Sequence, residues 1–351
     1  MELAALRSWG GAGRPLVLAV TLLLLLPVAA LPVGSVSTVS PRPLAMGGAF
    51  MAVDDELAAM AWNPAGFVPP DCGSEYRFRV HLNALGALPI IRETGLLTGE
   101  ESEPFASLPA IEKLSIALGG IAKAATVRVG GVAVGALLLE EHLDPEGLAD
   151  PSGLADAGDL LSAYYTTFAF AFRVAPSVTI GVSEVVLSGW DVPGERRNSE
   201  GRTYGVLLRP NDKVTLGLTY LDLPRDYRHY RLGVEGLASR TMNAGLAYRP
   251  VEELLLTLDL RDLSEKHEET SLEPRAGVEW NLWGRGALRA GAYREDAGET
   301  GVLTLGIGAI PVSSCPRSAR TPGGDSFVLN YAVLLEQGGP PRHLLSVLMH
   351  F

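Results

Sequence analysis

Hydrophobic and polar positions alternate with a period of two along most of the chain after about residue 75. In the segment Ala163 to Arg173, AYYTTFAFAFR, mainly large side chains hold one parity and small or polar ones the other. The segments KVTLGLTYL, LLLTLDLRDL and PRAGVEWN repeat the alternation. Successive side chains of a strand point to opposite faces of its sheet. The pattern therefore predicts a long series of two-faced β-strands.

Tight turns containing Pro, Gly or Asn separate these segments. Pro is placed in the turns because it has no backbone N–H to donate to a strand ladder. The turns recur as a weak hairpin repeat rather than as a stacked helical unit. The resulting fourteen predicted strands are 75–84, 121–129, 132–142, 163–173, 178–188, 201–210, 213–223, 240–249, 254–263, 273–281, 286–295, 301–310, 325–336 and 342–351.

The chemistry of the two faces favours a membrane barrel over a β-sandwich. A sandwich needs a polar outer face and a large apolar inner face. Here the less apolar face consists of Gly, Ala, Thr and single charges, which suits the lumen of a narrow barrel. A Lys or Arg facing lipid at mid-bilayer costs about 2–4 kcal/mol, and the charges mostly keep to one parity. We predict an all-β fold, a 14-stranded antiparallel transmembrane β-barrel with a small N-terminal plug.

The lengths of the connections support this count. If the first strand starts on the periplasmic side, five short connections fall inside: 130–131, 174–177, 211–212, 250–253 and 282–285. Five longer ones then fall outside: 85–120, 143–162, 189–200, 224–239 and 264–272. Outer-membrane barrels have short periplasmic turns and longer external loops. The long inside connection 311–324 is the exception.

The first thirty residues have the pattern of an export signal. Arg7 and Arg14 precede an apolar run from Pro15 to Leu26, and small residues follow at Ala29 and Ala30. The run is short for a membrane anchor, which is the alternative. We predict a cleaved signal peptide at 1–30, a plug (hatch) segment at 31–72 and an outer-membrane β-barrel at 73–351.

Composition narrows the function. The chain has 351 residues, 47% of them hydrophobic, 40 glycines and a net charge of −11. Because nucleic-acid binding needs clustered Lys and Arg, we expect no nucleic-acid partner. Cys72 and Cys315 both fall on the predicted periplasmic side, either as a disulfide or as free thiols.

Signals for catalysis are weak. The sequence contains no GxSxG, HExxH or P-loop pattern and no zinc-site spacing. Its six histidines are scattered, and His229 and His267 share the predicted external side. We therefore expect no enzyme activity, no cofactor and no metal.

Charged residues gather on the lumen parity of three neighbouring predicted strands. They could line a polar passage, or form a salt-bridge ladder that holds the barrel and its plug, since opposite charges across strands stabilise sheets. The residues are Asp259, Arg261, Arg275, Glu279 and Arg289.

Between the export signal and the first strand lies MGGAFMAVDDELAAMAWNPAGF, residues 46–67. Asp54 and Asp55 are placed to cap a short helix, Glu56 to Trp62, which the Asn63-Pro64 step ends. Such a compact segment could fill the barrel as a plug.

This stretch resembles the hatch of the FadL-type outer-membrane transporters and that of the related PorV/PorQ-type barrels. The matching residues are Gly47, Gly48, Ala49, Phe50, Asn63, Pro64, Ala65 and Gly66. The FadL resemblance implies passive transport of hydrophobic or small molecules, and the PorV resemblance implies a secretion-associated or structural scaffold. Both imply a fourteen-stranded barrel with an N-terminal plug.

These readings define the expected partners. They are outer-membrane lipid, a hydrophobic small-molecule ligand, the barrel-insertion machinery that reads a terminal aromatic such as Phe351, and secreted or periplasmic proteins for a scaffold. Asn63 to Gly66 could gate a lateral opening or simply end a helix. Four apolar residues of the first external loop could catch a ligand or pack on the rim: Leu85, Leu88, Ile90 and Ile91. The alternative to a membrane barrel is a secreted soluble β-sandwich that binds a partner.

Overall fold

The structure is a computed structural model. It describes residues 33–35, 41–55, 57–68, 77–83, 122–140, 163–192, 195–222, 240–263, 272–282, 286–294, 301–309, 326–336, 339 and 341–350. The chain divides into two compact units, Met1–Val33 and Gly34–Phe351.

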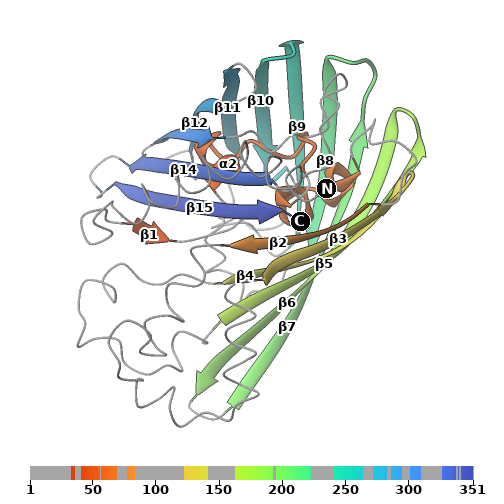
Figure 1. Cartoon of the computed structure of the whole chain (residues 1–351), viewed down its shortest axis with the longest axis vertical. Helices are drawn as coiled ribbons and strands as arrows, with labels where there is room; N and C mark the ends of the chain where they lie inside the picture. Colours follow the sequence, from red (N-terminus) through yellow and green to blue (C-terminus); the bar gives the residue numbers. More distant parts are fainter. Residues whose placement is uncertain are drawn as a thin grey trace, which may run out of the picture. The chain divides into compact units, whose positions relative to one another are not determined.

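Fourteen antiparallel strands follow one another in sequence order around the sheet (Figure 1). They are β2 (Arg77–Asn83), β3 (Ala122–Val129), β4 (Val132–Glu140), β5 (Ala163–Ala175), β6 (Val178–Val192), β7 (Glu195–Leu208), β8 (Val214–Asp222), β9 (Arg240–Val251), β10 (Leu254–Arg261), β11 (Glu273–Leu282), β12 (Gly286–Tyr293), β13 (Val302–Ala309), β14 (Ser326–Glu336) and β15 (Arg342–His350). A three-residue strand, β1 (Val33–Ser35), precedes them in the chain.

The sheet closes on itself, because β15 also pairs with β2. The seam joins Leu348, Met349 and His350 to the end of β2 in antiparallel register. The predicted fourteen-stranded antiparallel barrel is confirmed, and most strand ends fall within two residues of their predicted positions.

One predicted external loop is wrong. The segment 189–200 was expected to connect two strands, but β6 continues to Val192 and β7 begins at Glu195. The pairing continues regularly through Gly189 and Arg197. A ladder between two neighbouring strands forms through backbone groups, so it persists where the side chains have become polar. The expected strand end followed side-chain chemistry alone.

Three short helical segments lie between β1 and β2. They are α2 (Pro41–Ala45), α3 (Ala58–Trp62) and the 3₁₀-helix η3 (Pro64–Phe67). Helix α3 begins two residues later than predicted and ends where predicted, while α2 was not expected. Almost every described residue from Pro41 to Val68 is buried. We call residues 41–68 the plug.

Alternating side chains give the barrel wall two distinct faces. On β13 the burial alternates strictly, with Leu303, Leu305 and Ile307 exposed and Thr304 buried between them. On β5, Phe168 is 52% exposed beside a fully buried Thr167. The outer face is therefore mainly apolar, whereas most inward positions are small or polar, as a barrel in a lipid bilayer requires.

Candidate functional site: the plug and its seat in the barrel

The plug is held in a compact shape by its own polar groups. The Asn63 side chain donates to the Met51 carbonyl at 2.6 Å and accepts from the Ala65 amide at 3.1 Å. Gly47 and Gly48 have positive φ angles of 64° and 67°, a conformation that costs glycine little. These contacts fold the hatch motif into a defined loop rather than a simple helix end.

Asp55 organises the start of α3. Its Oδ1 accepts hydrogen bonds from the Leu57 and Ala58 amides, at 2.9 and 2.7 Å. These amides have no partner within a helix that starts at Ala58, so the carboxylate satisfies them. The predicted capping role therefore belongs to Asp55, whereas Asp54 pairs with Arg209 of the barrel wall.

Arg42 joins the plug to the wall. It forms an ion pair with Asp55 and another with Glu279 on β11, at 2.8 Å. Burial disfavours the guanidinium cation, but the two carboxylates outweigh that penalty and raise the pKa of Arg42 above its usual value. Glu279 also accepts from Arg289 at 2.6 Å, and Arg289 donates to Asn330 at 2.9 Å. Plug and wall thus share one buried charge network.

A second group of wall charges binds the plug backbone. Asp259 accepts from the Phe50 and Met51 amides at 2.7 and 3.0 Å. Arg261 donates to the Gly48 carbonyl at 2.8 Å. Arg275 donates to the Gly47 carbonyl at 3.4 Å and pairs with Glu273 at 3.0 Å. The wall side chains supply the partners that this irregular backbone would otherwise lack.

The structure therefore brings all five predicted lumen residues together around the plug. Their side chains contact the plug or each other, which is the arrangement of the ladder alternative. Arg42 and Asn330 belong to the network of Glu279, whereas Arg209 forms a separate ion pair with Asp54; none of the three was predicted. The outward–inward parity of β7 and β14 could have placed Arg209 and Asn330 on the lumen side.

Inward-facing glycines let the plug backbone lie directly against the wall. A Cβ on Gly217 would overlap the carbonyl of Met51, and one on Gly291 would overlap the backbone of Gly47. A residue larger than glycine could not occupy either position without moving the plug. The inward glycines in such close approach to the plug are Gly135, Gly181, Gly205, Gly217, Gly245, Gly277, Gly291 and Gly306.

Apolar packing completes the seat. Phe50 and Trp62 meet edge to face with ring centroids 6.3 Å apart. Phe67 packs beneath the guanidinium of Arg128 on β3, 5.8 Å from the ring centroid. Such ring contacts add to the hydrophobic effect of burying the side chains. The glycines, the ion pairs and the packing of α2 on β14 and β15 add further contacts. With the ring contacts, they place the plug against every strand from β3 to β15.

Several predicted site residues lie outside the described part of the chain. These are Cys72, Cys315, Phe351, His229, His267 and the loop residues Leu85, Leu88, Ile90 and Ile91. The signal peptide at 1–30 lies outside it too. No helix among the described residues is long and apolar enough to cross a membrane. The described residues also contain no cluster of three metal-ligating side chains.

Comparison with solved structures finds barrels with low sequence identity. A CymD monoaromatic hydrocarbon channel has 10% identity and a TM-score of 0.43, with 89% of this chain and 96% of that chain covered. A Pseudomonas aeruginosa FadL homologue has 11% identity and a TM-score of 0.42, with 90% and 97% covered. Mutants of a Rhodopseudomonas blastica porin have 14–15% identity and TM-scores of 0.34–0.35, with 66% of this chain and 77% of that chain covered. No protein-family profile and no curated protein sequence matches the chain.

Proposed function

We propose that this protein is an outer-membrane β-barrel that carries hydrophobic or small molecules passively across the membrane past its plug. The observation that carries the proposal is a plug seated across the lumen of a closed barrel whose outer face is apolar. The apolar face supports a position in lipid, because an aqueous surface seldom exposes contiguous apolar area of this extent.

A plug of this kind favours selective passage. Every strand from β3 to β15 contacts it, so a solute that enters the lumen meets the plug. An apolar molecule can enter or leave a hydrated lumen along hydrophobic surfaces. A polar molecule needs a continuous water-filled path instead. The hatch motif at Gly47–Phe50 and Asn63–Gly66 lies in the segment that contacts the wall glycines. Its resemblance to the FadL hatch supports a hydrophobic cargo.

The test is flux through proteoliposomes that contain the purified full-length chain. Uptake of a labelled fatty acid and of a labelled alkylaromatic is compared with uptake of sucrose. We expect the intact chain to pass one of the apolar compounds and to exclude sucrose. Deletion of residues 44–67 should admit sucrose as well. If neither apolar compound enters above the rate of empty liposomes, the transport proposal is wrong.

A scaffold for secreted or periplasmic proteins is the second candidate. The observation that favours it is the paired extension of β6 and β7 to Val192 and Glu195, beyond the outward ion pair of Glu184 and Arg202 at 3.3 Å. A polar two-stranded ribbon at that position could bind a protein by strand edges or charges. Crosslinking through cysteines placed in this ribbon, followed by identification of the captured protein, tests it. A defined partner without any flux would favour the scaffold.

A further inference from the structure

Two neighbouring strands present small side chains on the outer face where their neighbours present leucines. Across the sheet, Leu258 of β10 pairs with Ala276 of β11, which pairs with Ala292 of β12, which pairs with Leu303 of β13. Since directly opposed side chains in a sheet stand side by side, the two alanines form the floor of a depression and the two leucines its walls.

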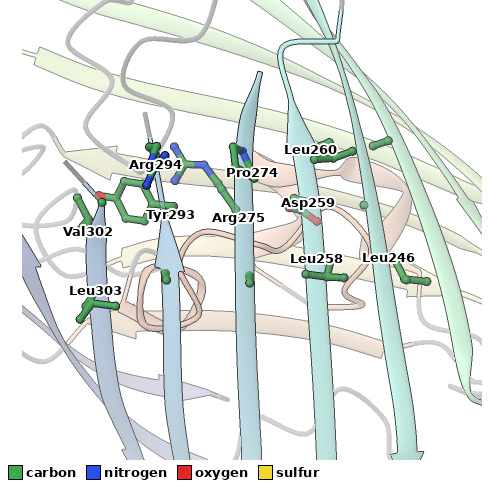
Figure 2. A pocket seen from close by; sticks show the side chains of 15 residues that line it. Leu246, Leu258, Asp259, Leu260, Pro274, Arg275, Tyr293, Arg294, Val302 and Leu303 are labelled. Atoms are coloured by element: carbon green, nitrogen blue, oxygen red, sulfur yellow. The ribbon is translucent and has the colours of Figure 1, made fainter. Parts of the chain in front are cut away.

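A cavity of about 700 Å³ covers this row and extends past Leu258 to Ala244 and Leu246 of β9. Leu258 and Leu303 are 56% and 60% exposed, whereas Asp259, on the opposite face of β10, is 2% exposed. The accessible surface of the cavity therefore belongs to the outward side chains, and the cavity opens on the outer face. Figure 2 shows Leu303 and Leu258 on separate strands, and the strand pairing places β11 and β12 between them. Its volume is typical of small-molecule sites.

One end of this groove carries a positive charge. Arg294 directly follows β12, lies at the strand end (Figure 2) and is exposed on the same parity as Ala292. Its amide donates to the Pro274 carbonyl at 3.4 Å, which holds the backbone at this position against β11. Among the described residues of β10 to β13 and their ends, Arg294 is the one outward-facing cation. The groove thus combines an apolar floor with a single guanidinium.

We propose that this groove binds an anionic phospholipid, with one acyl chain over Ala276 and Ala292 and the phosphate at Arg294. A guanidinium binds phosphate oxygens in a bidentate manner, and at a membrane surface it attracts anionic head groups. The one outward-facing cation among the described residues of β10 to β13 matches the single phosphate of a phospholipid, rather than the two phosphates of lipid A. The proposal rests on the membrane position proposed above and is independent of any cargo.

The test is native mass spectrometry of the full-length chain in detergent, titrated with phosphatidylglycerol, phosphatidylcholine or lipid A. Ala292→Phe fills the groove floor, and Arg294→Gln removes the charge. We expect each variant to weaken phosphatidylglycerol binding at least fivefold, and Arg294→Gln to abolish the preference over phosphatidylcholine.

Matched controls lie elsewhere on the outer face. Ala136→Phe changes an outward alanine of β4, and Arg202→Gln removes an exposed arginine of β7. Both should bind phosphatidylglycerol like the unmodified chain. Heat-modifiable gel migration verifies that each variant is folded.

Three results would overturn the lipid site. The first is unchanged phosphatidylglycerol binding in Ala292→Phe, and the second is tighter binding of lipid A than of phosphatidylglycerol. The third is loss of a dimer, rather than of lipid, in Ala292→Phe, which would make the groove an interface between copies. A chain that is monodisperse without detergent would instead overturn the membrane position and the proposed function. Failure of the two proposals is therefore distinguishable.

Discussion

At the scale of single residues, the plug is held by buried charges and by the absence of side chains at chosen wall positions. Arg42 bridges Asp55 in the plug and Glu279 in the wall. Removing one partner of a buried ion pair leaves an uncompensated charge, which costs more than the pair itself contributes. The glycines contribute differently, because they permit backbone contact without providing an interaction of their own.

Replacement of Arg42 by Gln should destabilise the plug by about 3 kcal/mol, since Asp55 and Glu279 would each lose a buried cation. Urea unfolding in detergent, or protease digestion of the plug, measures the change. Arg202→Gln is the control, because its pair with Glu184 is exposed and its loss should leave the unfolding midpoint unchanged. Equal midpoints for Arg42→Gln and the unmodified chain would contradict the role of Arg42 as an anchor.

Replacement of Gly217 by Ala should displace the plug, because the new Cβ would overlap the Met51 carbonyl. We expect a cost of about 1–3 kcal/mol, as for other overpacked sites. Gly301→Ala is the matched control, since its Cβ would lie 3.6 Å from the Tyr293 carbonyl oxygen, which is an ordinary contact distance. Thermal unfolding in detergent compares the two, and an equal melting temperature would refute the close approach.

At the scale of elements, the junction between α3 and η3 depends on one side chain. Asn63 closes the loop through a donor and an acceptor at once. The Asn63-Pro64 step ends the helix as predicted, but the hydrogen bond from Asn63 reaches Met51, a residue twelve positions earlier. Residue spacing alone does not reveal such a loop closure.

Asn63→Asp keeps the acceptor and loses the donor to Met51, so the loop should open locally. Loss of a buried hydrogen bond with an unsatisfied carbonyl costs about 1–3 kcal/mol. Hydrogen exchange at peptides covering residues 57–68 should become faster, while exchange in β10 to β13 should be unchanged. Exchange in residues 57–68 as slow as in the unmodified chain would show that the loop does not depend on this contact.

At the scale of the whole molecule, the face that carries the apolar residues determines how the chain meets its surroundings. A soluble β-sandwich and a membrane barrel share the alternation but differ in which face is exposed. In this barrel the exposed positions of β13 are Leu303, Leu305, Ile307 and Ala309, and three of the four buried ones, Thr304, Gly306 and Gly308, are small or polar. The arrangement places the apolar side chains outside.

Leu305→Arg should therefore destabilise the chain in lipid by about 2–4 kcal/mol, because it places a charge near the middle of the apolar face. Ala309→Arg, at the end of the same strand, should cost about 0–1 kcal/mol. Folding titrations in lipid vesicles measure both variants. In a water-exposed sheet both substitutions would be nearly neutral, so equal values for the two would argue against the bilayer.

The sequence by itself determined the fourteen strands, their faces and the position of a capped helix before the barrel. These features follow from short-range periodicity and from residues that start or stop an element. Strands β6 and β7 were predicted too short, because the polar residues near Gly189 and Arg197 hide a ladder made by the backbone. Only the tertiary structure decided what the inward face is for. Arg42 lies 237 residues from Glu279, and Met51 meets Gly217 across the lumen. Such contacts exist only once the barrel closes around the plug, since closure brings together residues that no local pattern connects.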